Sequence, residues 1–202
     1  MPPVPKITKW FLIALTAVFF VGDIGLMATG VDIRTWLALY PLSFSFQPWQ
    51  VFTYVLVHGD IVQLLFNLLG LWIFGAPLEY LWNEKRYLQF VTACGLTAAM
   101  IELLLTTLTG RPSMMVGVNS IIYGLLLAQA MLFPNKVITL VIPPVQMTMK
   151  TYVIVFGVLE LWVGLHAQDL VAHFAHLGGM LGAFLMIRYW RGQPPFKGRR
   201  RF

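Results

Sequence analysis

Charged residues and cysteines are scarce in this chain of 202 residues. Asp, Glu, Lys and Arg together make up 11% of the sequence, less than half of the roughly 25% that is typical of a soluble domain. So few charges cannot cover a water-facing surface, which excludes an ordinary globular domain and a disordered chain. The single cysteine, Cys94, cannot form a disulfide within the chain or a cysteine cage for a metal. Because 58% of the residues are hydrophobic, the composition indicates an integral membrane protein.

Six apolar runs approach the length of about 20 residues that a helix needs to span a bilayer. They cover residues 10–27, 60–81, 87–108, 116–133, 150–166 and 170–190. We therefore predict an all-α polytopic membrane protein with a six-transmembrane-helix core in a single domain, 1–202. The N-terminal segment is 1–9, the core 10–190 and the basic tail 191–202.

Two segments between the runs contain prolines. Segment 31–54 is rich in Trp, Tyr and Phe and carries Pro41 and Pro48, so we expect an aromatic interfacial first loop at headgroup level. Pro143 and Pro144 should interrupt any helix between the fourth and fifth runs.

The basic residues predict the orientation of the chain. With a cytoplasmic N-terminus and six spans, 12 of the 14 Lys and Arg residues fall on the cytoplasmic side, and only Arg34 and Arg111 fall outside. The positive-inside rule thus predicts a multi-pass protein with both termini cytoplasmic, in a bacterial-type inner membrane. Nucleic acid is not an expected partner, although the formal charge is +6, because no soluble module with interleaved aromatic residues accompanies the charge.

Polar residues inside the runs fall at a similar depth, near the outer ends of the helices. They are Gln63, Asn67, Glu102, Asn119, Ser120, Glu160, His173 and His176. Since polar groups in hydrocarbon are costly and commonly functional, their shared depth indicates one cavity that opens outward. Taken singly, each has a simpler explanation: Ser and Asn can bond a neighbouring helix, and the two Glu residues can cap loop amides or pair with Arg111.

The last run carries two histidines and a stripe of small residues. His173 and His176 are three residues apart, but no third ligand is evident, so we predict no metal site and no cofactor. Small residues recur every four positions and should let another helix pack closely. They are Gly178, Gly179, Gly182 and Ala183.

Three blocks of this sequence together resemble the rhomboid family of intramembrane serine proteases (peptidase S54-like). The blocks are VHGDIVQLLFNLLGLWIFGAPLEYLW, GVNSIIYG and AHLGG. The resemblance implies a six-helix bundle. It also implies a nucleophilic Ser in a Gly-x-Ser-Gly motif of the fourth helix and a His base in the sixth. A His and an Asn of the second helix would stabilise the oxyanion.

Position by position, the resemblance assigns roles unevenly. His176 falls on the base, Asn67 on the oxyanion Asn and His58 on an earlier second-helix His, while Gln63 replaces the oxyanion His. Asp60, just before the second helix, should be its N-cap.

The nucleophile motif is altered. Gly117 matches its first Gly, and Tyr123 matches the aromatic residue expected four positions after the nucleophile. These two residues put Asn119 in the nucleophile slot and Ser120 in the position of the following Gly. An amide is a very poor nucleophile, and one residue along a helix turns a side chain by about 100°.

Three hypotheses follow from these residues. The first is a catalytically impaired pseudoprotease that binds transmembrane segments of client proteins within the lipid bilayer. The alternative is an active intramembrane serine endopeptidase that uses Ser120 and His176 to cleave transmembrane substrates. A small-molecule transporter or channel is least favoured, because the chain shows no inverted repeat.

Overall fold

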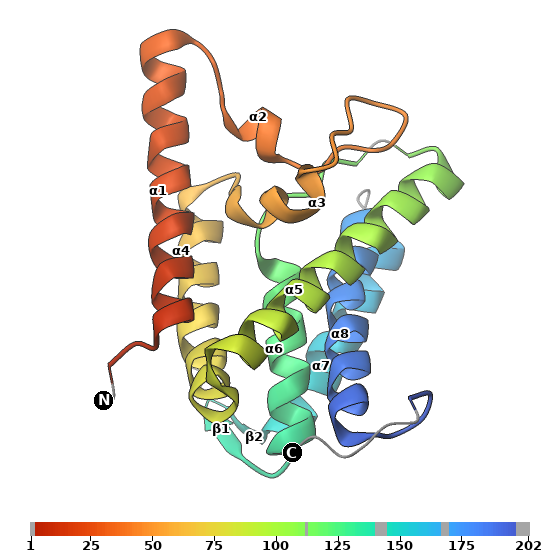
Figure 1. The fold of residues 1–202 in the computed structure, drawn as a ribbon. Helices are drawn as coiled ribbons and strands as arrows, with labels where there is room; N and C mark the ends of the chain where they lie inside the picture. Colours follow the sequence, from red (N-terminus) through yellow and green to blue (C-terminus); the bar gives the residue numbers. More distant parts are fainter. Residues whose placement is uncertain (1–2, 112, 140–144, 167–169, 197–202) are drawn as a thin grey trace.

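The computed structural model describes residues 3–111, 113–139, 145–166 and 170–196, and it is mostly helical (Figure 1). The helices, in chain order, are α1 (Lys6–Thr29), α2 (Arg34–Leu37), α3 (Gln50–Thr53), the 3₁₀ turn η1 (Tyr54–Leu56), α4 (Ile61–Gly70), the π-helical turn η2 (Leu71–Gly75), α5 (Ala76–Thr109), α6 (Asn119–Leu132), α7 (Met149–His166) and α8 (Leu170–Arg191). The basic residues of the predicted tail from Lys197 onward lie outside the described residues.

Four helical stretches are long and apolar enough to cross a membrane, judged by length and composition within the described residues. They are Lys6–Thr29, Ile61–Thr109, Met149–His166 and Leu170–Arg191, and α6 is a shorter apolar helix. This architecture confirms the prediction of a helical membrane protein. That the chain crosses the membrane six times remains a prediction.

The stretch Ile61–Thr109 contains both the second and the third predicted run. Its 49 residues would measure about 74 Å if straight, more than twice the thickness of a bilayer core. The chain reverses at Asn83, whose backbone is non-helical (φ 68°, ψ 167°), so α4 and α5 run in different directions in Figure 1. One residue thus separates two helical limbs where the sequence predicted an interval between two helices.

A short β-hairpin, which the sequence did not predict, joins α6 to α7. Strand β1 (Val137–Thr139) pairs antiparallel with β2 (Gln146–Thr148), with Ile138 opposite Met147. The two prolines Pro143 and Pro144, expected to interrupt a helix here, lie outside the described residues.

The aromatic segment 31–54 forms two short helices, α2 and α3, that are tied to neighbouring elements. The Arg34 guanidinium contacts the carboxylates of Asp23 (2.8 Å) and Asp32 (2.8 Å). Its hydrogen bond holds the pKa of Asp32 below the ordinary value. Leu39 and Met115 exchange two backbone hydrogen bonds of 3.0 Å each, which attach this segment to the loop before α6.

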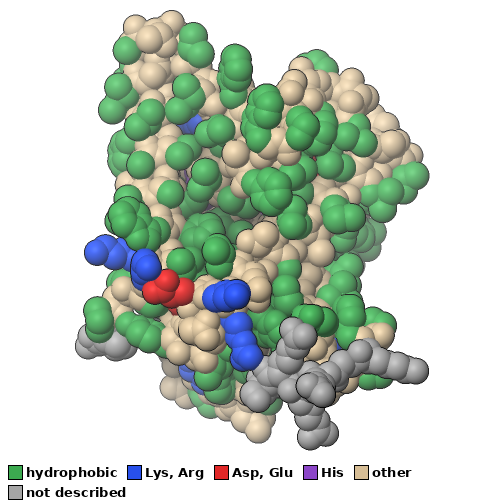
Figure 2. Space-filling model, viewed as in Figure 1, with side chains coloured by type: hydrophobic (Ala, Val, Ile, Leu, Met, Phe, Trp, Pro, Cys, Tyr) green, Lys and Arg blue, Asp and Glu red, His purple; other side chains and the backbone are tan. Residues whose placement is uncertain are grey.

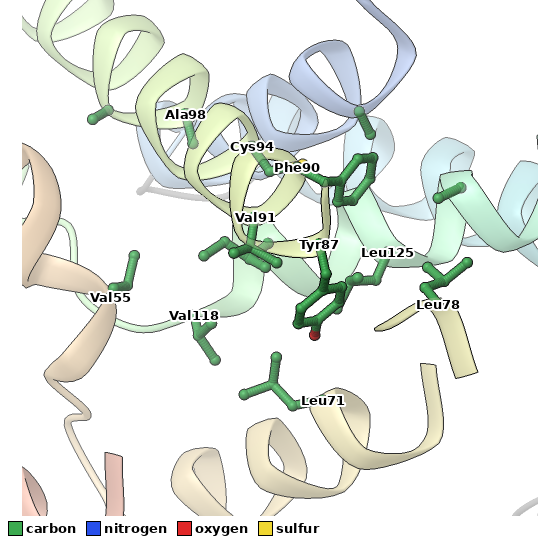
Figure 3. Packing of buried hydrophobic residues seen from close by; sticks show 14 of the residues in the cluster. Val55, Leu71, Leu78, Tyr87, Phe90, Val91, Cys94, Ala98, Val118 and Leu125 are labelled. Carbon is green, nitrogen blue, oxygen red and sulfur yellow. The ribbon is translucent and has the colours of Figure 1, made fainter. Parts of the chain in front are cut away.

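The core centres on α5, which packs against α8, α6 and the π-helical turn η2. Figure 3 shows one part of it, with apolar side chains from several elements directed towards one another. Labelled residues of α5 are Leu78, Tyr87, Phe90, Val91, Cys94 and Ala98, and those outside it are Val55, Leu71, Val118 and Leu125. Burial of apolar surface against close-packed neighbours fixes α5 as the central helix of the bundle.

Helix α8 approaches its neighbours through three glycines. A Cβ at Gly178 would lie 3.1 Å from the Cα of Ala98, and one at Gly182 would overlap Thr97 of the same helix, α5. A Cβ at Gly179 would overlap the carbonyl oxygen of Ser120 in α6. The small residues therefore let α8 lie at backbone contact distance from both α5 and α6.

Basic side chains gather at one end of the bundle. On the face shown in Figure 2 they lie mainly in the lower half of the view, where α1 begins. Lys6 pairs with Glu84 (3.1 Å), and Arg86 lies over the ring of Trp190 (6.0 Å). The start of α1, the reversal at Asn83 and the end of α8 are thus at the same end.

Glu79 holds the N-terminus of α1. Its carboxylate accepts hydrogen bonds from the backbone N–H groups of Ile7 and Thr8, both at 2.7 Å, and from the Thr8 hydroxyl at 2.8 Å. The first N–H groups of a helix have no partner within the helix. A carboxylate of α5 therefore satisfies them and fastens α1 to the rest of the bundle.

We expect Glu79→Ala to lower the free energy of unfolding by about 2–4 kcal/mol, because a buried charged acceptor of three hydrogen bonds is lost. The matched control is Glu84→Ala, which removes an exposed ion pair with Lys6 and should cost about 0–1 kcal/mol. Thermal unfolding in detergent measures both variants. Equal losses in the two variants would contradict the role given to Glu79.

Candidate functional site

Helix α6 begins in a sharp turn that requires glycine. Gly117 has φ +94°, a left-handed conformation that L side chains rarely adopt. Its N–H donates to the Tyr54 carbonyl (3.0 Å), and α6 starts two residues later, at Asn119. The turn puts the polar pair Asn119 and Ser120 at the first positions of the helix.

Three side-chain amide groups surround Gly117. The position of a Cβ built on Gly117 lies 3.1 Å from Gln63 Nε2 and 3.6 Å from the Nδ2 atoms of both Asn67 and Asn119. Each of these atoms is a hydrogen-bond donor. We call Gln63, Asn67 and Asn119 the amide cluster, because together they direct N–H groups at one small volume.

The start of α4 orients the amide cluster. Asp60 is the N-cap, as predicted, and accepts a hydrogen bond from the Gln63 N–H (2.8 Å). The Gln63 side-chain oxygen accepts from the Gly59 N–H (2.9 Å), which turns its Nε2 donor towards Gly117. Asn67 follows one turn later and is buried; among the residues that the structure describes, its Nδ2 has no hydrogen-bond partner. This buried donor is therefore unsatisfied.

The Ser120 hydroxyl lies against Tyr54, beside α5. Tyr54 donates its hydroxyl hydrogen to the Gly95 carbonyl (2.9 Å), so the Ser120 hydroxyl, 3.2 Å from Tyr54 Oη, is the donor of that pair. Ser120 is completely buried, and its carbonyl packs on Gly179. Its hydroxyl is thus held on the side of α5.

His176 lies on a different side of α6. Its ring stacks on that of Tyr123, with 5.5 Å between centroids and 8° between planes. Its Nδ1 is 2.5 Å from Glu160 Oε1, and His173 Nδ1 is 2.9 Å from the same oxygen. Tyr123 donates its hydroxyl to the other carboxylate oxygen at 2.6 Å. We call Glu160, His173, His176 and Tyr123 the carboxylate cluster.

The structure brings the predicted residues together in two groups. Asn67, Gln63, Gly117 and Asn119 form one, and Tyr123 and His176 belong to the other, with Ser120 in neither. His58 is buried before α4, with Nδ1 3.4 Å from the Leu56 carbonyl, and burial lowers its pKa.

The contacts of two residues of the site could not be predicted from the sequence. The depth of Glu160 predicts a shared cavity with the histidines, or else a contact with loop amides or Arg111; the structure shows it in contact with two histidines and a tyrosine. Tyr54 was read only as part of an aromatic loop, whereas it binds the Ser120 hydroxyl. Depth along a helix can be counted in a sequence, but the direction of a side chain across a bundle cannot.

The fold and the site define an integral membrane protein of helical type, with polar residues of several helices meeting inside the bundle. Residues 45–192 match the sequence model of the Rhomboid domain. The chain therefore belongs to the rhomboid family, which confirms the resemblance inferred from its motifs.

Relatives in this family include named proteases. The chain is 25% identical over 185 residues to Rhomboid protease GluP of Bacillus subtilis (89% of this chain, 34% of the relative). It is 28% identical over 86 residues to Rhomboid-like protein 15 of Arabidopsis thaliana (42% and 21%). It is 27% identical over 71 residues to Rhomboid protease GlpG of Pectobacterium atrosepticum (35% and 26%). The chain spans about a third or less of the length of these relatives.

Proposed function

We propose that this chain is a catalytically impaired rhomboid that binds transmembrane segments of client proteins without cutting them. In this proposal it crosses a bacterial-type inner membrane six times, both termini are cytoplasmic and the aromatic segment 31–54 lies at the interface. The observation that carries the proposal is the stacking of Tyr123 on His176, because the residue one turn before Tyr123 in α6 belongs to the same face of the helix.

That residue is Asn119. Residues four apart on a helix lie on the same face, so Asn119 sits one turn above Tyr123 on the side of α6 that carries His176. An amide at this position cannot attack a carbonyl at a useful rate. The residue in the place of the nucleophile is therefore inert.

Ser120 is a poor substitute for the missing nucleophile. To face His176, it would have to turn by about 100° around the axis of α6. Such a rotation would break its hydrogen bond to Tyr54 and move its carbonyl, which is in backbone contact with Gly179 of α8. Close-packed backbone contacts resist displacements of this size.

The amide cluster supports binding of a peptide segment. Unwound backbone in a membrane exposes carbonyl oxygens that must find hydrogen-bond donors within protein. Gln63, Asn67 and Asn119 supply three donors around Gly117, and that of Asn67 is buried. A client segment whose helix is locally open can therefore be held by its carbonyl groups.

The test uses the purified chain in liposomes with a reporter that carries a helix-unstable transmembrane segment. Photo-crosslinking should capture the reporter intact, and Gln63→Leu with Asn67→Leu should reduce capture about tenfold or more, the loss expected for two hydrogen bonds. The matched control, Gln129→Leu, changes an amide of α6 that bonds the Phe74 carbonyl, away from the amide cluster, and should leave capture unchanged.

Cleavage of the reporter that disappears in both Ser120→Ala and His176→Ala would overturn the proposal and establish the active endopeptidase. A covalent fluorophosphonate adduct on Ser120 of the folded protein would do the same. Capture that is equal in the Gln63→Leu, Asn67→Leu double variant and in the unmodified chain would remove the amide cluster from the binding site.

A further inference from the structure

The carboxylate cluster joins three helices through a single buried acid. Glu160 of α7 receives contacts from His173 and His176 of α8 and from Tyr123 of α6. Two imidazole nitrogens converge on the same oxygen, Oε1. The side chain of Glu160 is 10% exposed, and those of the histidines are 24% and 17% exposed, so the cluster is sheltered but open to a small solute.

We propose that Glu160, His173 and His176 bind a divalent transition-metal ion, with Zn²⁺ as the expected occupant. One donor atom from each residue lies within 4.8 Å of the others. Two imidazoles and one carboxylate form a ligand set that suits Zn²⁺. Three protein ligands leave a fourth tetrahedral position for water or another small ligand.

The distances fit this ion after a small adjustment. Donor atoms bound to tetrahedral Zn²⁺ at about 2.0–2.1 Å lie about 3.3 Å from one another. The two nitrogens are now 2.5 and 2.9 Å from Oε1, so each must move away from that oxygen by less than about 1 Å. The two nitrogens lie within 4.8 Å of each other, so they must come no more than about 1.5 Å closer to bind the same ion.

Proton balance follows from the same geometry. An imidazole that donates a hydrogen bond to Oε1 carries its proton on Nδ1, whereas a ligating nitrogen must offer a lone pair. Binding of the ion at Nδ1 therefore moves the proton of each neutral ring to Nε2. The bound ring is neutral, and in a charged imidazole the ion displaces the Nδ1 proton to solvent while the Nε2 proton stays.

Tyr123 completes the arrangement around the ligands. Its hydroxyl holds Glu160 Oε2 at 2.6 Å, which leaves Oε1 directed at the two histidines. Its ring stacks on His176 and fixes the orientation of that imidazole. Hydrogen bonds that orient a ligating group in this way commonly change metal affinity by about 10- to 100-fold.

The site goes beyond the proposed binding of clients and does not depend on it. The amide cluster belongs to α4 and the start of α6, whereas all three metal ligands belong to α7 and α8. A bound ion would fasten α7 to α8 near the end where the chain passes from one to the other. Failure to capture a client would therefore not contradict the metal site, and failure to bind metal would not contradict the binding of clients.

The test measures Zn²⁺ and Co²⁺ binding by the full chain, purified in detergent, freed of any affinity tag and stripped with a chelator. After loading with Zn²⁺ and dialysis, elemental analysis should find about one ion per chain. Co²⁺ should give the visible absorption of a tetrahedral site. Competition with a chromophoric chelator then gives the affinity.

Two variants of the cluster and one control define the ligands. Tyr123→Phe removes a residue that only orients the ligands, so it should lower the Zn²⁺ affinity by about 10- to 100-fold. His173→Ala removes a ligand itself and should lower the Zn²⁺ affinity by about 100-fold or more. His166→Ala is the matched control, because this histidine of α7 is exposed and bonds the Trp162 carbonyl (2.8 Å) outside the cluster. It should bind as tightly as the unmodified chain.

A chain that retains no ion after dialysis would overturn the proposal, as would a His166→Ala variant that loses as much affinity as His173→Ala. If His173→Ala does not fold, Glu160→Gln replaces it, since Gln keeps the shape of the acid but offers no anionic ligand. Metal binding by Glu160→Gln at the affinity of the unmodified chain would equally refute the assignment.

Discussion

The double substitution Asn119→Ser with Ser120→Gly is expected to make the protein react covalently with fluorophosphonate at position 119. The introduced hydroxyl would lie one turn above Tyr123, on the face of α6 that carries His176. An imidazole within hydrogen-bond reach activates a serine as a nucleophile. Loss of a catalytic serine can cost about a millionfold in rate, so labelling should rise by about a hundredfold or more over the unmodified chain even if the new geometry is imperfect.

Two controls make the result specific. Ser120→Gly alone removes the native hydroxyl without adding one and should not be labelled. Adding His176→Ala to the double variant should abolish labelling, because the base is lost. The reaction is run with a chelator so that His176 stays free of metal. If the double variant folds but stays unlabelled, the orientation of Asn119 towards His176 is wrong.

The second large effect concerns the packing of α6 on α8. We expect Gly179→Ala to lower the free energy of unfolding by about 3 kcal/mol or more, because the added methyl group would overlap the Ser120 carbonyl. The obstacle is backbone, so no side-chain rotation can relieve it. The two helices must separate, and the Ser120–Tyr54 contact beside them is expected to loosen as well.

Gly157→Ala is the matched control for this substitution. Gly157 lies in α7, and the nearest atom to its added Cβ would be Met180 Cε at 4.0 Å, an ordinary contact. This variant should be as stable as the unmodified chain or slightly more stable, since Ala favours helix more than Gly does. The unfolding of both variants is followed with a thiol-reactive fluorogenic dye, which reports exposure of the buried Cys94. Equal unfolding midpoints for Gly179→Ala and Gly157→Ala would show that the packing of α8 does not depend on close approach at Gly179.

The helical membrane architecture could be predicted from the sequence because it follows from apolar length alone. The first, fifth and sixth runs correspond to α1, α7 and α8 with small shifts at their ends. The hairpin of β1 and β2 could not be predicted, since its strands have three residues each and carry no clear alternation. The polar stretch 83–86 predicted the break between the second and third runs, but not that a single backbone conformation at Asn83 makes the reversal.

The candidate site was predictable only in part, for a related reason. Motif spacing put Asn119 and Tyr123 on one face of a helix, and the structure adds the stacking of Tyr123 on His176. The partners of Glu160 depend on how α7 is rotated against α8, which packing across the bundle determines. Ser120 and Tyr54 are 66 residues apart, and no local pattern connects them.

The reversal at Asn83 bears on how the protein enters the membrane. Because one non-helical residue joins the two limbs, there is no loop long enough for one limb to be inserted while the other remains in water. The limbs should therefore partition into lipid together, as a helical hairpin. Lys85 and Arg86 lie two and three residues after Asn83, and in the proposed orientation their charge would keep the tip of that hairpin from being translocated. Lengthening this turn with a flexible insert would uncouple the two insertion events.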